Sequence, residues 1–487
     1  MVGILAANSA VSGDHEVTNS LRLNDDDTPR FDKTLGTPTN TDKFTASFWF
    51  KKCKMAAAQT VFGYDSGGTA QSYITFTSGD ALEYYNRLGS GNASQFTTNK
   101  LFRDPSAWYH IVVAVDSTDG TSGDRCKIYV NGERQTSFAT SNFADQNQNQ
   151  NLNSALAIRL FAWSSGEQVD GYISELYFID GAAKAPTDFG TTNDNGVWVP
   201  KNYLGAYGDN GYRFEFKQTG TSTNASGIGA DTSGNGTHFA VTNLAATDVT
   251  TDTPSNNFAT MNSIESPRQQ GGVITFSEGN CKIVTSYTDA NYARYPQAYS
   301  TMAVTKGKWY FEMKPISGDV YNIGVFSPED YASNSTTNPY GGYAATGCIY
   351  TEGGEVRQDD ASTEDMGTYG TSDIVGCALD MDNNAVYFHK NNTYINSGNP
   401  TSGGSKTGAF SLPTTGPYAS STSSITHYGF TCGDEGAADV GTMSINFGNP
   451  PYAPSSIESD ANGYGSFEYA PPSGYYALCT KNLAEYG

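Results

Sequence analysis

The chain has 487 residues, of which 37% are apolar and only 16% are charged, and its formal net charge is −22. This length exceeds what one hydrophobic core supports, so we expect about two to four domains. The acidic balance argues against nucleic acid and against an anionic membrane surface, because both are bound through basic faces. The sequence contains no stretch of about 18 apolar residues of the kind that predicts a membrane span, so we expect no membrane insertion.

The first strands follow an N-terminal arm, residues 1–19. FTASFWFKK (residues 44–52) alternates apolar and polar positions, which predicts a strand with one dry face. WYHIVVAVDSTDGTSGDRCKIYVNGERQ (residues 108–135) then supplies two strands, and its Asn131-Gly132 reversal is a strong signal for a two-residue hairpin. Further strands follow up to residue 217. Residues 20–217 are therefore expected to form one β-sandwich.

A similar pattern returns at VGCALDMDNNAVYFHKNN (residues 375–392). A strand pair of this kind cannot bury its apolar face alone, so each copy needs a sandwich around it. The fold class predicted is all-β, with two antiparallel jelly-roll sandwiches in tandem. The second sandwich spans residues 272–452, an irregular connection spans 218–271, and an aromatic-rich tail spans 453–487.

Seven cysteines are spread along the chain without a CxxC pair or a Cys/His cluster of metal-ligand spacing. We expect reduced, buried thiols. The start of the chain is also a poor secretory signal.

Flat aromatic side chains are the candidates for stacking on sugars. Trp49 lies on the opposite strand face from Phe48 and Phe50, and two tyrosine pairs flank Gly-rich turns. The candidate carbohydrate-binding residues are Trp49, Tyr84, Tyr85, Tyr340 and Tyr343. For each of them, packing in a core is the alternative.

Aspartate clusters could gather oxygens around Ca²⁺. The candidate ligands are Asp25 and Asp27 in one cluster and Asp116 and Asp119 in another. Aspartate is also common in turns for local hydrogen bonding, so no cofactor is certain.

No active site is predicted. Glucanases on jelly rolls use carboxylates paired on one strand, and this spacing is absent. Glu175 and Glu312 are single strand acids, and none of the five histidines, His110 and His389 among them, stands beside a GxSxG-type elbow. The chain is expected not to be an enzyme.

FTASFWFKK, AWYHIVVAVDST, KIYVNGE and DGYISELYFIDG, in this order, resemble the laminin-G-like or concanavalin-A-like jelly roll, which is used for glycan and protein recognition. KGKWYFEM, NIGVFS, VGCALDMDNNAVYFHKNN and MSINFG resemble the SPRY sandwich. The start GILAANS…VTNSLRLNDDD, the linker GIGADTSGNGTHF…NLAATDV…DTPSNNF and the end PPSGYYALCTKNL resemble virion structural proteins of tailed phages, especially marine ones.

This resemblance implies a tail-fibre or other particle-surface adhesin that binds a host glycan or surface protein. It would be made in the host bacterial cytoplasm and displayed on the virion surface beside other virion proteins. Because single sugar sites are weak, we expect a homo-oligomer, with a trimer favoured. The alternatives are a head-decoration or adaptor protein without a receptor, and a polysaccharide depolymerase.

Overall fold

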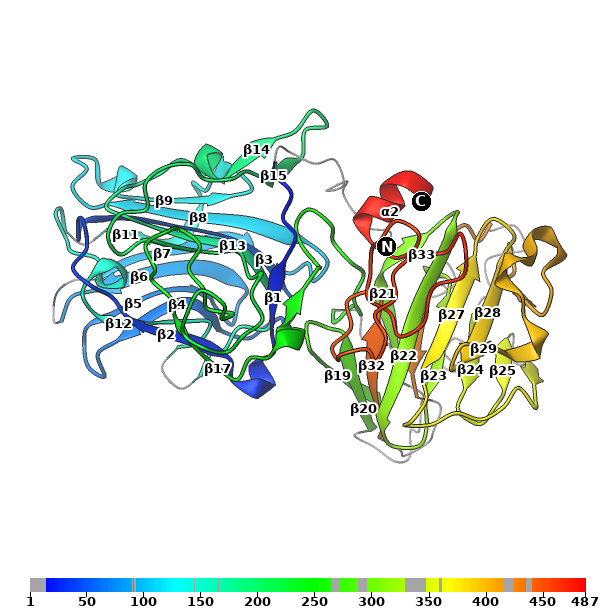
Figure 1. Cartoon of the computed structure of the whole chain (residues 1–487). Coiled ribbons are helices and arrows are strands. Elements are labelled where there is room, and N and C mark those ends of the chain that lie inside the picture. Colours follow the sequence, from blue (N-terminus) through cyan, green and yellow to red (C-terminus); the bar gives the residue numbers. More distant parts are fainter. Residues whose placement is uncertain are drawn as a thin grey trace. The chain divides into compact units, whose positions relative to one another are not determined.

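A computed structural model describes residues 15–89, 91, 93–143, 145–163, 166–264, 272–287, 296–328, 347–358, 361–415, 424–434 and 440–487. Nearly all regular structure is β, in antiparallel sheets, which confirms the predicted fold class (Figure 1). The chain divides into two compact units. The described part of the first ends at Asn256, and that of the second runs from Asn257 to Gly487. Within the described residues no helix is long and apolar enough to cross a membrane.

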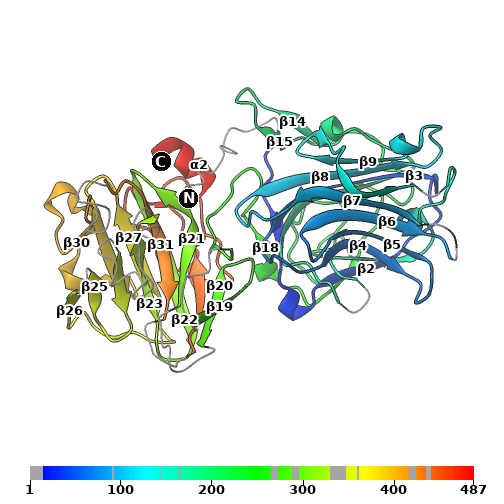
Figure 2. The ribbon, with the colours of Figure 1, turned by 180° about the vertical axis from the view of Figure 1, so that it is seen from behind.

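The first unit is a sandwich of two eight-stranded sheets, which we call sheet A and sheet B. Sheet A contains β1 (Ser20–Leu23), β3 (Lys43–Lys52), β8 (Trp108–Asp116), β9 (Cys126–Val130), β10 (Glu133–Arg134), β13 (Gly171–Asp180), β16 (Tyr212–Phe214) and β18 (Val249–Thr250). Sheet B, seen best from behind in Figure 2, contains β2 (Arg30–Thr34), β4 (Gln59–Asp65), β5 (Gln71–Phe76), β6 (Ala81–Arg87), β7 (Ser94–Leu101), β11 (Phe138–Asn142), β12 (Ala157–Leu160) and β17 (Ala240–Thr242).

Alternation along β3 fixes which side chains enter the core between these sheets. Phe48 and Phe50 point inward, where their ring centroids lie 5.9 Å from Phe62 and 4.9 Å from Phe76 of sheet B. Thr45, Ser47 and Trp49 therefore face the outer side of sheet A, as the period of two requires. A segment with the small hairpin β14 (Gly190–Thr192) and β15 (Trp198–Pro200) covers this outer side.

The Asn131-Gly132 hairpin forms as the sequence predicts. Glu133 pairs with Val130, and both turn residues have positive φ, 49° for Asn131 and 82° for Gly132. These are the signs of a two-residue turn whose twist matches the flanking strands.

Residues 218–256, expected as part of a connection, lie within the first unit instead. β17 pairs with β2 and β18 pairs with β1, while Phe239 and Leu244 join the core between the sheets. Buried apolar side chains thus hold a segment whose Gly, Thr and Asp content resembles a linker.

The second unit is also a two-sheet sandwich. Sheet C contains β19 (Gly272–Ser277), β20 (Lys282–Tyr287), β22 (Lys308–Ser317), β27 (Val375–Asp380), β28 (Ala385–Lys390), β29 (Thr393–Tyr394), β30 (Phe410–Ser411), β32 (Thr442–Asn446) and β33 (Tyr476–Ala477). Sheet D contains β21 (Gln297–Val304), β23 (Asn322–Phe326), β24 (Cys348–Thr351), β25 (Val356–Gln358), β26 (Ala361–Thr363) and β31 (Tyr428–Gly433).

The aromatic tail packs on this second unit. β33 pairs in parallel with β22, and Phe467 and Tyr475 lie in a buried cluster with Tyr310 and Tyr387 on the face of sheet C opposite sheet D. The chain then ends in the short helix α2 (Thr480–Tyr486). Among the described residues, 3₁₀ turns lie at Asp25–Asp27, Ser122–Asp124, Asn151–Asn153, Pro186–Asp188, Ala246–Asp248, Ile395–Ser397 and Pro400–Ser405.

Candidate functional site

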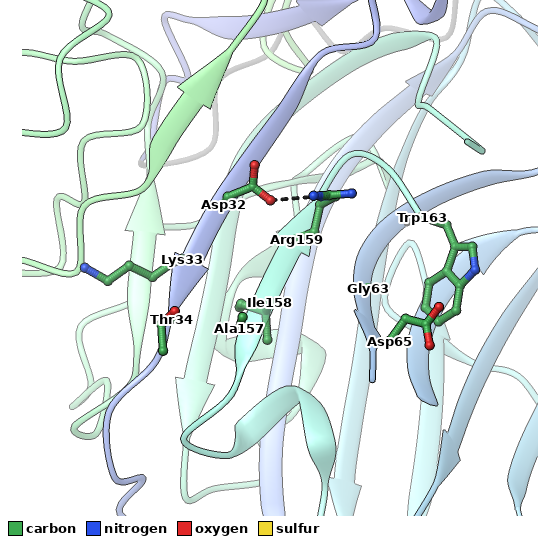
Figure 3. A pocket seen from close by; sticks show the side chains of 9 residues that line it. All are labelled: Asp32, Lys33, Thr34, Gly63, Asp65, Ala157, Ile158, Arg159 and Trp163. Carbon is green, nitrogen blue, oxygen red and sulfur yellow. Dashed lines mark hydrogen bonds and ion pairs between the residues drawn. The ribbon is translucent and has the colours of Figure 1, made fainter. Parts of the chain in front are cut away.

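A pocket lies on the outer face of sheet B, over β2, β12 and β4 (Figure 3). It holds about 410 Å³, a volume suited to a small ligand group such as a sugar. It is lined by Asp32, Lys33, Thr34, Gly63, Asp65, Ala157, Ile158, Arg159 and Trp163.

Strand register places the functional side chains in one row across the sheet. Arg159 of β12 lies opposite Asp32 of β2 on one side and opposite Gly63 of β4 on the other. Gly63 in turn lies opposite Tyr73 of β5, and Tyr73 opposite Tyr85 of β6. The row therefore changes from charged to aromatic where it crosses β4.

The charged end is a three-residue ion cluster. Arg159 Nε donates to Asp32 Oδ1 at 2.8 Å, and Arg30 Nε donates to Asp32 Oδ2 at 3.0 Å. The three side chains are between 31% and 39% exposed, so the cluster is open to solvent and to a ligand. Because two guanidinium groups share one carboxylate, the cluster carries one net positive charge.

The indole of Trp163 forms the opposite side of the pocket, beside Asp65 (Figure 3). Paired backbone hydrogen bonds between Trp163 and Gly166, 2.7 and 2.8 Å long, fix the backbone of the residue that carries this ring. Gly63 makes room for it, since a β-carbon there would come within 3.1 Å of Trp163 Cε3. A half-buried indole on a polar surface is the feature that sugars stack on.

Two tyrosines form a wall next to the indole. The rings of Tyr73 and Tyr85 are stacked, with centroids 4.9 Å apart and planes 9° apart, and Trp163 meets Tyr73 edge-on at 5.2 Å. Tyr73 donates its hydroxyl to Glu83 Oε1 at 3.0 Å. Burial and the Glu83 carboxylate raise the pKa of Tyr73 far above its usual value, so this hydroxyl stays a donor.

Of the predicted carbohydrate-binding residues, Tyr85 lies in this row and two others do not. Tyr84, its neighbour on β6, points into the core and is fully buried, as alternation along a strand requires. Trp49 is only 4% exposed, so neither it nor Tyr84 presents a ring to a sugar. Tyr340 and Tyr343 lie outside the described residues.

Trp49 is instead one layer of an aromatic stack on the outer side of sheet A. His110 stacks on it at 4.8 Å, and Trp198 of β15 stacks beyond His110 at 6.0 Å. Trp198 Nε1 donates to His110 Nδ1 at 3.0 Å, so the ring proton of His110 is on Nε2, 2.9 Å from Ser47 Oγ. Burial lowers the pKa of His110 to about 3, and the imidazole is neutral.

The predicted calcium ligands are engaged in local contacts. Asp25 pairs with Lys54, and Asp27 accepts from Asn24 at 2.8 Å. Asp116 pairs with Lys43 at 2.9 Å, and Asp119 accepts from the backbone of Thr121 at 2.8 Å. Nowhere in the described ranges do three or more His, Cys, Asp or Glu side chains gather in a way that could hold a metal.

The two strand acids are buried in hydrogen-bond networks. Glu175 is paired with Arg213, whose Nη2 lies 2.8 Å from it. Glu312 accepts from the Tyr310 hydroxyl, the Asn446 amide and the backbone N–H groups of Glu468 and Tyr469, at 2.9 to 3.1 Å. Burial raises the pKa of Glu312 to about 7. Both acids tie strands together and face no pocket that we identify in the described part of the chain.

Sequence reasoning missed Asp32, Arg159, Trp163 and Tyr73. Tyr73 could have been found, because the Thr77–Asp80 reversal fixes the β5–β6 register and so pairs it with Tyr85. The other three come from separate segments that only long-range pairing brings together. No local pattern signals that pairing.

One similar solved structure is stonustoxin, at 16% identity over 39% of this chain and 27% of that chain, with a TM-score of 0.27. The SPRY domain of human HERC1 is similar at 12% identity over 37% of this chain and 94% of that chain, with a TM-score of 0.24. A candidate carbohydrate binding protein from Bacteroides ovatus is similar at 15% identity over 47% of this chain and 58% of that chain, with a TM-score of 0.32. This chain thus spans about a quarter of the stonustoxin chain. No curated protein matches. Residues 23–187, which carry every residue of the pocket, match the family model of the concanavalin A-like lectin/glucanases superfamily.

Proposed function

We propose that this chain is a non-enzymatic glycan-binding protein and that the sheet B pocket is its binding site. The observation that carries the proposal is the half-buried Trp163 indole, which faces a pocket whose other walls supply a guanidinium and two carboxylates. An aromatic face packs against the apolar side of a sugar, while charged groups accept from or donate to its hydroxyls. The match of residues 23–187 to a lectin and glucanase superfamily supports this assignment.

The test is binding of the full chain to a panel of immobilised polysaccharides. Trp163→Ala should abolish binding, because the stacking surface is lost while the sandwich core is untouched. Leu204→Ala, at a side chain 87% exposed in the same unit, is the matched control and should bind like wild type. Equal binding by Trp163→Ala and wild type would place the site elsewhere.

We further propose that the protein acts on the surface of a tailed-phage virion, as a tail-fibre or other adhesin beside other virion proteins. The support is the resemblance of the start, the linker and the end of the chain to such proteins. A head-decoration or adaptor role is the alternative. Labelling intact particles with an antibody against the first unit tests the location, and particles without label would contradict it.

Several linked copies would compensate for the weak affinity of one sugar site, so we propose a homo-oligomer, with a trimer favoured. Light scattering of the purified chain gives its mass directly. A monomer at micromolar concentration would contradict the proposal.

Polysaccharide cleavage is the competing function. Near the pocket, Asp32 is held by two arginines, and Glu83 accepts from Tyr73, Gln95 and Thr97. Both carboxylates are therefore already engaged in hydrogen bonds on sheet B. Incubation with a bound polysaccharide should leave its size distribution unchanged, and progressive shortening would identify a depolymerase.

A further inference from the structure

We propose that the ligand of the pocket is an uncharged oligosaccharide chain, and that this chain continues from Trp163 across β5 and β6 to a second contact on the ring of Tyr85. The inference rests on the proposed glycan-binding function and adds the length and the charge class of the ligand. It assigns to binding the outer face of β5, β6 and β7, which contribute no residue to the pocket itself.

The outer face of sheet B continues from the pocket toward β7. Strands β4, β5, β6 and β7 are neighbours in this sheet, and Figure 2 shows them side by side. Tyr84 and Phe96 point into the core, so alternation turns their strand neighbours outward. The outward side chains on β5, β6 and β7 include Tyr73, Glu83, Tyr85, Arg87, Gln95 and Thr97. Aromatic rings and hydrogen-bonding groups of this kind suit the apolar face and the hydroxyls of a sugar.

The ring of Tyr85 turns one of its faces toward β7. Its other face is stacked on Tyr73, and the 4.9 Å between the ring centroids equals the spacing of neighbouring strands. The two rings therefore stand side by side on the sheet. Gln95 lies opposite Tyr85 on β7, and Tyr85 is half-buried. A sugar ring over β7 can therefore pack against Tyr85.

Polar groups beside this ring are held in fixed positions. The Glu83 carboxylate accepts from the Tyr73 hydroxyl, from the Thr97 hydroxyl and from Gln95 Nε2, the last at 3.0 Å. Because the amide nitrogen of Gln95 is bonded to Glu83, its carbonyl oxygen is directed elsewhere and can accept from a sugar hydroxyl. A side chain that is already ordered loses less conformational freedom when a ligand binds.

The distance between the two contacts requires a chain of sugars. Trp163 packs over Gly63 of β4 and meets Tyr73 edge-on at 5.2 Å, so Trp163, Tyr73 and Tyr85 form a row across the strands. Three strand spacings, about 14 Å, separate β4 from β7. A single sugar ring stacked on Trp163 does not reach Gln95, whereas a chain that runs along the row contacts both ends.

The charge balance favours an uncharged chain. The charged side chains that line the pocket sum to zero, and they are Asp32, Lys33, Asp65 and Arg159. Farther along the row, the negative charges of Glu83 and Glu167 both raise the pKa of Tyr73, which places two carboxylates beside the proposed path. Carboxylates repel an anionic chain, whereas the hydroxyls of an uncharged chain can donate to them.

The experiment measures by calorimetry how the affinity of the full chain depends on ligand length and charge. The neutral probes are glucose with cellohexaose, mannose with mannohexaose and xylose with xylohexaose. At least one of the six-unit probes should bind more than about tenfold tighter than its monosaccharide. A six-unit oligogalacturonate should bind no more tightly than its carboxyl-reduced, uncharged form.

Variants on β6 and β7 then test the second contact through the ratio of six-unit to one-unit affinity. Tyr85→Ala should lower this ratio about tenfold, and Tyr85→Phe, which keeps the ring, should retain most of it. Gln95→Ala, which leaves the stacked rings in place, should lower the ratio about threefold. Tyr129→Ala is the matched control, because it removes a half-buried tyrosine from β9 of sheet A. Thermal unfolding checks that all four variants fold.

An unchanged ratio in both Tyr85→Ala and Gln95→Ala would overturn the second contact and leave the Trp163 pocket standing. Tighter binding of oligogalacturonate than of its carboxyl-reduced form would overturn the charge class. If wild type binds a polysaccharide of the panel but none of the neutral six-unit probes, this inference fails alone. Failure of wild type to bind any polysaccharide would overturn the proposed function, and this inference with it.

Discussion

Replacing Gly132 with alanine should destabilise the first unit by about 3 kcal/mol, through two separable effects. Gly132 has a φ of 82°, which costs an L-residue about 1–2 kcal/mol. In addition, the new β-carbon would lie 2.6 Å from Trp198 Cζ3 and 2.7 Å from Cε3, so the indole must move. That movement weakens the hydrogen bond from Trp198 to His110, worth about 1 kcal/mol, and part of the ring stacking.

Gly196 provides the matched control. Its φ of 78° is nearly the same, but a β-carbon there would meet no atom within 4 Å. Gly196→Ala should therefore show the backbone cost alone, and the difference between the variants should be about 1–2 kcal/mol.

Urea unfolding followed by tryptophan fluorescence is the assay, because four of the five tryptophans, all but Trp309, lie in the first unit. Equal unfolding midpoints for Gly132→Ala and Gly196→Ala would refute the role of Gly132 in seating Trp198.

Three further predictions concern buried charges and thiols. The folded-state pKa of Glu312 is raised from 4.5 to about 7, so its stabilising contribution to the second unit should be complete below about pH 4.5 and lost as the pH rises through about 7. Urea unfolding at a series of pH values in this range should show the decline. A Glu312→Gln variant with the same pH profile as wild type would contradict this prediction. Lys52→Met should lower the free energy of unfolding by about 3–5 kcal/mol, measured with urea, because it leaves the buried Asp80 carboxylate with the exposed Arg103 as its charged partner. Lys54→Met removes an exposed partner of Asp25 and should lower that free energy by less than about 1 kcal/mol. Equal losses of stability in the two variants would contradict this reasoning. All seven cysteines are buried and form no disulfide with one another. A thiol reagent should therefore react with them only after the chain unfolds, and fast modification of any thiol in the native state would contradict this prediction.

Local patterns predicted the elements of this fold better than its site. Alternation in residues 44–52 and the Asn131-Gly132 turn are short-range features, and both appear in the structure as expected. The adjacent Tyr84 and Tyr85 show the limit, because alternation sends one inward and one outward, but only the partner sheet decides which. Trp49 faces away from the core as predicted, yet a segment more than a hundred residues later covers it.

The pocket itself depends on pairings that no local pattern encodes. Arg159 reaches Asp32 because β12 pairs with β2, whose residues lie far away in the sequence. Residues 218–256 also depend on long-range pairing: their composition resembles a linker, yet they form two strands and contribute the buried Phe239.

The pairing of β33 with β22 has a consequence for synthesis on the ribosome. Tyr476 and Ala477 cover strand β22 beside Trp309 and Tyr310, about 170 residues earlier in the chain. At 5–20 residues per second, the ribosome needs roughly 10–30 s to make that stretch. By contrast, all the strands that the structure describes in the first unit have been made once residue 250 has emerged. We therefore expect nascent chains in which the first unit has already folded, while strand β22 of the second unit still lacks β33 and needs protection by chaperones.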